Sequence, residues 1–136
     1  MDTDVVSYLF RGDPRAEAYR PAIDGRILVI SFMTVAEMEY GARNRGWSEH
    51  RLAALRRHLG SFVVYPFRTE LCRAWAEVMD AAARHGCRLE CADAWVAATA
   101  RLHALPLVTN NSRDFRGIRD LVQVVSPIAG DPEEQH

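Results

Sequence analysis

The sequence predicts an α/β sandwich in which helices cover a central, mainly parallel sheet. Two patterns carry this prediction: four short apolar runs are typical of strands, and amphipathic helical patterns separate most of them. Strands that alternate with helices form βαβ units, whose strands run parallel. The length of 136 residues is enough for one hydrophobic core. We expect one domain over residues 1–129 and a disordered tail, rich in Pro and acidic residues, over residues 130–136.

The first half of the chain contains two of the predicted strands. Residues 27–30 form an apolar, β-branched run, which predicts a buried strand. Thr34 and Glu37 have the spacing of a capping box and predict a helix that follows this strand. A second helix is expected over residues 49–59, which would form a hairpin with the first. Residues 62–65 then read as the second strand.

The second half repeats the alternation. Apolar residues at helical spacing predict a long helix from about residue 71 to 86 and another over residues 91–103. Two further strands are expected at residues 106–109 and 122–125. Residues 110–119, which separate them, read as a polar loop.

Composition limits the classes of function. The formal net charge of -1 gives no sign of nucleic-acid binding by the molecule as a whole, so such binding requires a local patch. Every basic residue is Arg; genomic composition bias explains this better than phosphate binding, but lysine-dependent mechanisms are excluded. Three cysteines cannot all pair within the chain, and no apolar run approaches the roughly 20 residues of a membrane span. We expect a cytoplasmic protein without a membrane partner.

Acidic residues follow predicted strands or open predicted helices at Asp2, Glu37, Asp93 and Asp114. Ligands of parallel sheets gather beyond the carboxyl ends of the strands, where these residues should meet. Carboxylates that meet repel one another, and Mg²⁺ or Mn²⁺ relieves this repulsion through oxygen ligands. Each acid alone also fits an ordinary role as a terminal, capping, first-turn or turn residue. Because all four acids are expected at the same edge of the sheet, a shared metal site is favoured over four separate ordinary roles.

Four ordered motifs surround these acids: DTDVVSYL at residues 2–9, SFMTVAEMEYG at 31–41, CADAWVAATA at 91–100 and LVTNNSRDF at 107–115. Together they resemble the motifs of PIN-domain proteins, and within that family the VapC-type ribonuclease toxins. The resemblance spans almost the whole chain. It implies a three-layer α/β/α sandwich with a sheet of four or five strands.

The resemblance also implies a function. It is that of a metal-dependent endoribonuclease, the toxin of a type II toxin–antitoxin (VapBC) pair, which leaves 5′-phosphate and 3′-hydroxyl ends. Asp2, Glu37, Asp93 and Asp114 would be the catalytic and metal-binding acids. Asp2 and Asp93 would be the direct ligands of Mg²⁺, or alternatively of Mn²⁺.

Other polar residues beside the motifs are candidates for supporting roles. Hydrogen bonds to the site acids are expected from side chains near them, namely Thr3, Asp4, Thr109 and Asn111. Arg113 and Arg116 flank Asp114 and are candidate phosphate contacts, although roles as solvated loop charges fit them equally well.

The resemblance implies three partners: an RNA substrate, a VapB-type antitoxin whose C-terminal segment covers the acidic site, and a second copy packed through the helical face. An antitoxin Arg among the carboxylates would replace the charge of the metal. The sequence differs from the family motifs at its N-terminus. The family places a hydrophobic strand before its first Asp, but only Met1 precedes Asp2 here, so either the start lies late or the first strand is short.

Three alternatives remain. A catalytically impaired PIN module would mainly bind antitoxin or RNA. A haloacid-dehalogenase-like phosphatase would use the Asp2-x-Asp4 motif, but such enzymes usually need a Lys, which is absent. Cys87 and Cys91 are too few for a zinc site and fit packing at a helix boundary. The histidines are expected at the surface or at edges, among them His58, His85 and His103.

Overall fold

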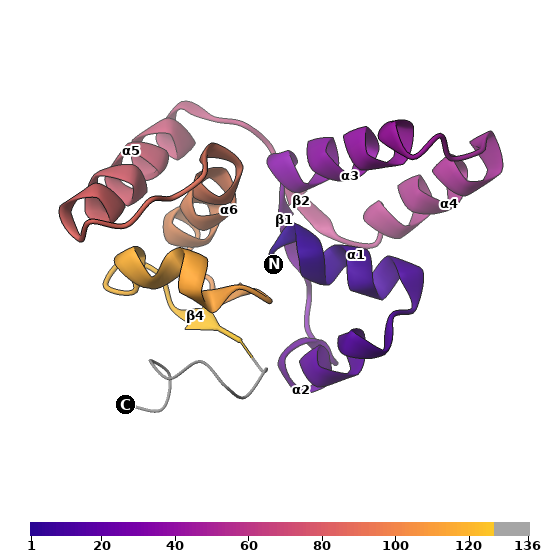
Figure 1. The fold of residues 1–136 in the computed structure, drawn as a ribbon, viewed down its shortest axis with the longest axis horizontal. Helices are drawn as coiled ribbons and strands as arrows, with labels where there is room; N and C mark the ends of the chain where they lie inside the picture. Colours follow the sequence, from indigo (N-terminus) through magenta and orange to yellow (C-terminus); the bar gives the residue numbers. More distant parts are fainter. Residues whose placement is uncertain (127–136) are drawn as a thin grey trace.

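The computed structural model describes residues 1–126, in which helices lie on both sides of short parallel strands (Figure 1). The strands are β1 (Val29–Ser31), β2 (Val63–Tyr65), β3 (Leu107–Val108) and β4 (Val124–Val125). The α-helices are α1 (Thr3–Arg11), α2 (Arg20–Ile23), α3 (Phe32–Asn44), α4 (Glu49–Leu59), α5 (Thr69–Arg84) and α6 (Cys91–Leu102), and the 3₁₀ helices are η1 (Pro14–Tyr19) and η2 (Ser112–Ile118). The predicted α/β architecture with parallel strands is confirmed. No helix in residues 1–126 is long and apolar enough to cross a membrane.

The strands pair in two separate parallel ladders, β1 with β2 and β3 with β4. The expected single sheet of four or five strands is therefore not formed by residues 1–126. The N-terminus lies between the ladders, where the Met1 ammonium donates to the Val29 carbonyl at 3.2 Å and the Asp2 amide donates to the Val108 carbonyl at 2.8 Å. Two residues are too few to form a strand, so they bridge the ladders without merging them.

The first helix after β1 begins earlier than predicted. Ser31 is the residue before α3, and its Oγ accepts a hydrogen bond from the Met33 amide at 3.1 Å. The predicted capping box at Thr34 and Glu37 is therefore wrong, because one serine both ends β1 and caps α3. Thr34 lies inside the helix and is fully buried. The helix predicted over residues 49–59 is confirmed as α4, which contacts α3.

Helices α5 and α6 pack along each other and form the larger core with η2. α6 is buried on most sides, because residues 96–100 are all buried, as is Ala94. The polar loop predicted at residues 110–119 is wrong for most of its length. η2 occupies it, because Phe115 and Ile118 lie three residues apart on one face and pack into this core.

The N-terminal region and His58 also need comparison with the expectations from the sequence. Residues 3–23, for which the sequence predicts no element, form α1, η1 and α2. His58, expected at the surface or at an edge, is half-buried and packs between Phe10 and Phe62, with ring centroids 5.4 and 5.1 Å away. Burial lowers the pKa of His58. The predicted tail at residues 130–136 lies outside the described residues.

Candidate functional site

Asp2 is the most firmly held of the predicted acids. It precedes α1, and its Oδ1 accepts a hydrogen bond from the Thr3 amide at 2.7 Å. Its Oδ2 accepts from the Thr109 hydroxyl at 2.8 Å, and only 6% of the residue is exposed. Burial raises the pKa of Asp2, although both hydrogen bonds favour the ionised carboxylate. Asp2 is therefore fixed in place by its sequence neighbour Thr3 and by the distant Thr109.

The hydroxyl of Thr3 connects α1 with α3. Thr3 Oγ1 lies 2.8 Å from Glu37 Oε1, to which it donates, and 3.1 Å from the Thr34 hydroxyl. Glu37 follows Thr34 by three residues, so both side chains project from the same face of α3. This contact brings Glu37 to the edge where Asp2 lies, as the motifs predict.

The segment after β3 is tied to α1 and η1. Asn111 Nδ2 donates to Asp4 Oδ2 at 3.2 Å, and the Asn111 amide donates to Thr109 Oγ1 at 3.0 Å. The buried Tyr19 donates from its hydroxyl to Asn110 Oδ1 at 2.9 Å. The predicted supporting residues Asp4, Thr109 and Asn111 thus contact one another or a site acid.

Asp93 lies half-buried in the first turn of α6, where the partial positive charge of the helix N-terminus favours an acid. Its pKa is nevertheless raised to about 7. Burial is the largest cause, followed by the charges of Asp2, Asp114, Glu37 and Asp4. These five carboxyl groups therefore share one electrostatic field, although they come from distant parts of the sequence.

Asp114 and its two neighbouring arginines are exposed on η2. The Asp114 amide donates to the Asn111 carbonyl at 3.0 Å, which places the turn beside the segment that contacts Asp4. Arg116 donates to the Arg113 carbonyl at 3.1 Å. Arg113 and Arg116 are both exposed, so they are accessible to an anionic ligand. Exposure fits a phosphate contact and a solvated loop charge equally well.

The side chains at this edge are chemically suited to bind a divalent metal ion. All the clustered groups are carboxylates, the hard oxygen donors that Mg²⁺ and Mn²⁺ prefer. The ion pairs found within residues 1–126 engage other acids, as in Arg56 with Glu39 at 2.9 Å. As the side chains stand, no group of three or more His, Cys, Asp or Glu in that part of the chain is close enough to hold a metal. The acids would have to come closer together before three of their oxygens could share one ion.

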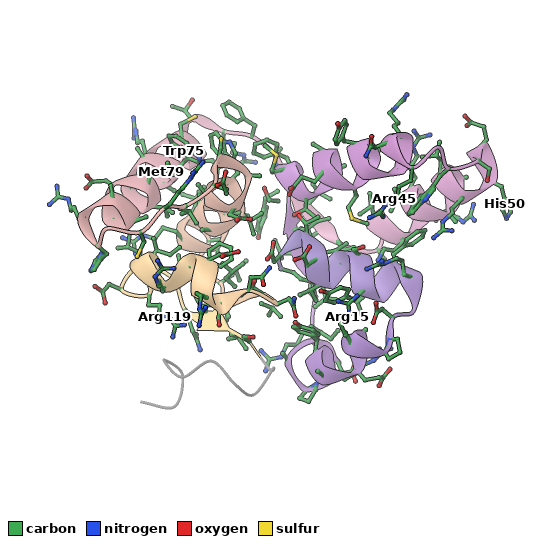
Figure 2. All side chains as sticks on the ribbon, in the orientation of Figure 1. Arg15, Arg45, His50, Trp75, Met79 and Arg119 are labelled. Atoms are coloured by element: carbon green, nitrogen blue, oxygen red, sulfur yellow. The ribbon has the colours of Figure 1, made fainter. Side chains whose placement is uncertain are left out.

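The site also contains residues that the sequence reasoning did not single out. Thr34, expected only as a helix cap, faces Thr3, and its position three residues before Glu37 on the same helix face is a signal that could have identified it as part of the site. Tyr19 and Asn110 hold the segment after β3, but Tyr19 lies outside every motif. Figure 2 places Arg15 beside α1 and η1, where its guanidinium carbon lies 4.1 Å from the Tyr8 ring centroid. This arginine is paired with Asp13, whose hydrogen bond is the largest cause of the raised pKa of Arg15; the charge of Asp4 also contributes.

The structure belongs to the class of α/β proteins that gather carboxylates at the edge of parallel strands. A comparison with protein families identifies which family of this class it is. The model of the PIN domain family matches residues 1–121, and the chain belongs to this family.

Among curated proteins, the chain is 25% identical over 118 residues to Ribonuclease VapC2 of Haemophilus influenzae, an alignment that covers 87% of this chain and 89% of the relative. It is also 25% identical to the tRNA(fMet)-specific endonuclease VapC of Shigella flexneri, over 89% of this chain and 92% of that protein. Among solved structures, that of VapBC-1 from nontypeable Haemophilus influenzae aligns with a TM-score of 0.77 at 25% identity, over 93% of this chain and 95% of that one.

Proposed function

We propose that the protein is an endoribonuclease that depends on Mg²⁺ or Mn²⁺ and acts as the toxin of a toxin–antitoxin pair. The observation that carries this proposal is the gathering of carboxylates at one edge. Thr109 holds Asp2 there and Thr3 holds Glu37, and burial together with the charges of the other acids raises the pKa of Asp93 to about 7. A site that gathers uncompensated negative charge suits a divalent cation and, through it, a phosphodiester. Relatives that are named ribonucleases or endonucleases support the same activity.

Asp2 and Asp93 would hold the metal, with Glu37 and Asp114 completing the acidic site. A metal bound there would make an attacking water more acidic and would offset negative charge on the phosphate. The protein contributes orientation: Thr109 and the Thr3 amide fix both oxygens of Asp2. The Thr3 hydroxyl fixes Glu37, whose carboxylate can accept a proton from an attacking water.

The test is cleavage of total cellular RNA by the purified protein with Mg²⁺ or Mn²⁺. We expect cutting that EDTA abolishes and that Asp93→Asn lowers at least 100-fold. The matched control is Glu90→Gln, because Glu90 is an exposed acid three residues away that pairs with Arg88 at 3.2 Å. Glu90→Gln should keep at least half of the activity. Equal cleavage by Asp93→Asn and the unsubstituted protein would refute the proposal.

A VapB-type antitoxin would inhibit the enzyme by placing an arginine among the carboxylates. Apolar side chains of the antitoxin could pack on Phe32, Phe67 and Trp95, whose ring centroids lie 5.6 to 6.0 Å apart. Phe67 is 57% exposed, and Trp95 follows Asp93 by two residues. The solved VapBC-1 structure supports this pairing. A purified complex should not cleave RNA; full activity of the complex would contradict this mode of inhibition.

A second candidate function is a PIN module that mainly binds its antitoxin or RNA. The spacing of the acids favours it, because no three of them within residues 1–126 hold a metal as they stand. The two candidates differ in one result. If Asp93→Asn weakens antitoxin binding while RNA remains uncut by every variant, the protein is a binding module.

A further inference from the structure

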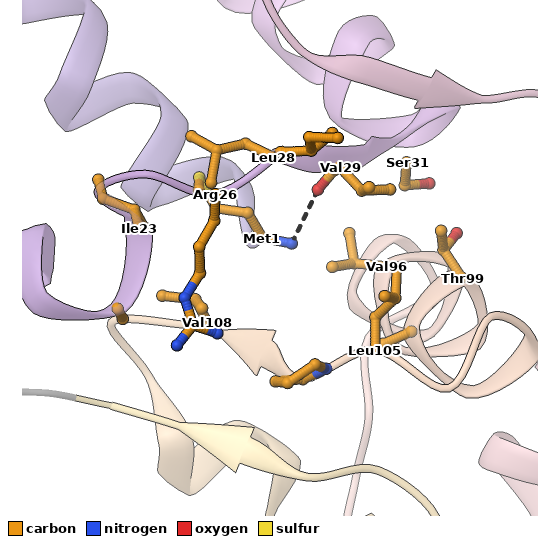
Figure 3. A pocket seen from close by; sticks show the side chains of 14 residues that line it. Met1, Ile23, Arg26, Leu28, Val29, Ser31, Val96, Thr99, Leu105 and Val108 are labelled. Carbon is orange, nitrogen blue, oxygen red and sulfur yellow. Dashed lines mark hydrogen bonds between the residues drawn. The ribbon is translucent and has the colours of Figure 1, made fainter.

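Two features lie close to Asp2 in the described chain, namely a cavity beside Met1 and one face of α1. The cavity has a volume of about 170 Å³ and is lined mainly by apolar side chains, including those of β1, β3 and α6 (Figure 3). An RNA phosphate would lose its hydration among apolar groups, so the cavity does not suit the substrate. The face of α1 carries polar groups instead, because Asp4, Tyr8 and Arg11 follow one another at helical spacing.

Arg15 of η1 lies over the Tyr8 ring on this face. The guanidinium carbon is 4.1 Å from the centroid of the ring, and one terminal nitrogen donates to the Tyr8 hydroxyl at 3.2 Å. The Tyr8 ring is itself buried, with its centroid 6.4 Å from that of the buried Tyr19 ring. One face of the guanidinium therefore rests on a fixed aromatic support.

The edge of the guanidinium is held by Asp13. Arg15 Nε donates to Asp13 Oδ1 at 3.1 Å, and the second terminal nitrogen donates to Oδ2 at 2.8 Å. These bonds lower the pKa of Asp13 to about 2, so the pair stays ionised at neutral pH. The Arg15 side chain is nevertheless 55% exposed, and with one face and the nitrogens engaged, this exposure belongs mainly to the outer face. A planar cation held in this way is a platform on which a nucleobase can stack.

The platform lies close to the acidic edge. Tyr8 follows Asp4 by four residues, which is about 6 Å along α1. Asp4 accepts a hydrogen bond from Asn111, whose amide donates to Thr109, and Thr109 holds a site acid. An RNA strand with a phosphate at the acids can therefore place a nearby base over Arg15.

We propose that Arg15 is a specificity-determining residue for the RNA substrate, and that its outer face stacks on one nucleobase close to the cleaved phosphodiester. The three layers would be the Tyr8 ring, the guanidinium and the base. Every base offers a π-face, and a purine offers the larger one, so we expect a preference for a purine at this position. The inference rests on the proposed function, because it takes RNA as the substrate.

The test uses short synthetic RNAs that span a site cut in total cellular RNA, each with one base removed to leave an abasic sugar. With Arg15 intact, we expect an abasic sugar at one position to lower kcat/KM about tenfold, mainly through KM. Arg15→Lys keeps the charge but removes the planar face. It should lower cleavage of the complete RNA to a similar extent and show no further loss with that abasic RNA. Losses that multiply would overturn the proposal, because the residue and the base would then act independently.

The matched control is Arg20→Lys, because the Arg20 side chain is 49% exposed and pairs with Glu17 and Asp24. It should leave kcat/KM for every RNA within about twofold, since exposed ion pairs contribute little. A purely structural role of Arg15 would lower the cleavage of every RNA, complete or abasic, by the same factor, and would overturn the proposal.

Two other outcomes separate this inference from the proposed function. Cleavage that no abasic position affects, or an Arg15→Lys variant that weakens only antitoxin binding, would overturn the stacking role and leave the ribonuclease intact. If the protein with Arg15 intact cuts no RNA, the proposed function is wrong, and the stacking role is wrong with it.

Discussion

Thr3 contacts two neighbours through a single hydroxyl, so a small change there tests how the acids are held. Thr3→Val keeps the shape of the side chain but removes the hydrogen bonds to Glu37 and Thr34. We expect RNA cleavage to fall about tenfold and the free energy of unfolding to fall by about 1 kcal/mol. Thr3→Ser restores the hydroxyl and should recover most of the cleavage. Equal activities of the Val and Ser variants would exclude this positioning role.

Asp93 should reduce stability at neutral pH when no metal is added. Its pKa is about 7 in the folded protein and 3.8 in the unfolded chain, so the folded state binds more protons between these values. The free energy of unfolding therefore falls as pH rises from about 4 to 7. We expect Asp93→Asn, measured with EDTA, to be more stable by about 2 kcal/mol at pH 8, after allowing for partial solvent exposure.

The pH profile of this variant is the check. The advantage of Asp93→Asn in denaturant titrations should shrink between pH 8 and pH 5. A constant difference at all pH values would mean that the substitution acts through packing rather than through the charge.

The site acids could be predicted because each lies in a short motif, but their supporting contacts could not. Thr109 contacts Asp2 across 107 positions of sequence, and Tyr19 reaches Asn110 across 91. No local pattern encodes such pairs. The raised pKa of Asp93 is also a property of the assembled edge, since four of its causes are charges on other parts of the chain.

At the scale of elements, η2 depends on one glycine that packs against the end of α5. A Cβ on Gly117 would lie 2.9 Å from Cys87 Cβ and 3.2 Å from Ala82 Cα. We expect Gly117→Ala to lower the free energy of unfolding by about 2 kcal/mol, because backbone or a short side chain must move.

The matched control is Gly60→Ala. Gly60 has right-handed helical backbone angles, and a Cβ there would meet only carbonyl oxygens at 3.4 Å. Its free energy of unfolding should change by less than about 0.5 kcal/mol. Urea titrations of both variants compare the two effects; similar losses would indicate a general cost of replacing glycine.

Elements with strong periodicity could be predicted, and elements defined by tertiary contacts could not. α4 has leucines at helical spacing and begins and ends where expected. η2 carries a mainly polar sequence, and its packing on α5 through the buried Phe115 and Ile118 accounts for its helical form. The start of α3 was misplaced because Thr34 and Glu37 also fit a capping box, while Ser31 makes the cap.

At the scale of the molecule, the acids come from α1, α3, α6 and η2, so a cation bound among them would join distant parts of the fold. We expect Mg²⁺ at ten times its dissociation constant to stabilise the protein by about 1.4 kcal/mol and raise its melting temperature. Asp93→Asn should lose this response, and Glu90→Gln should retain it. A similar rise in all three proteins would indicate a general salt effect.

The contact between Asp2 and Thr109 has a consequence for synthesis on the ribosome. Asp2 is held by Thr109, which is synthesised 107 positions later and directly follows β3, the strand that pairs with Val124 and Val125. Domains fold as their chains emerge, and contacts of such long sequence separation form last. The acidic edge is therefore completed only after Thr109 has been synthesised. Until that moment, the hydrogen bond from the Thr3 amide is the only one of the two that Asp2 can accept.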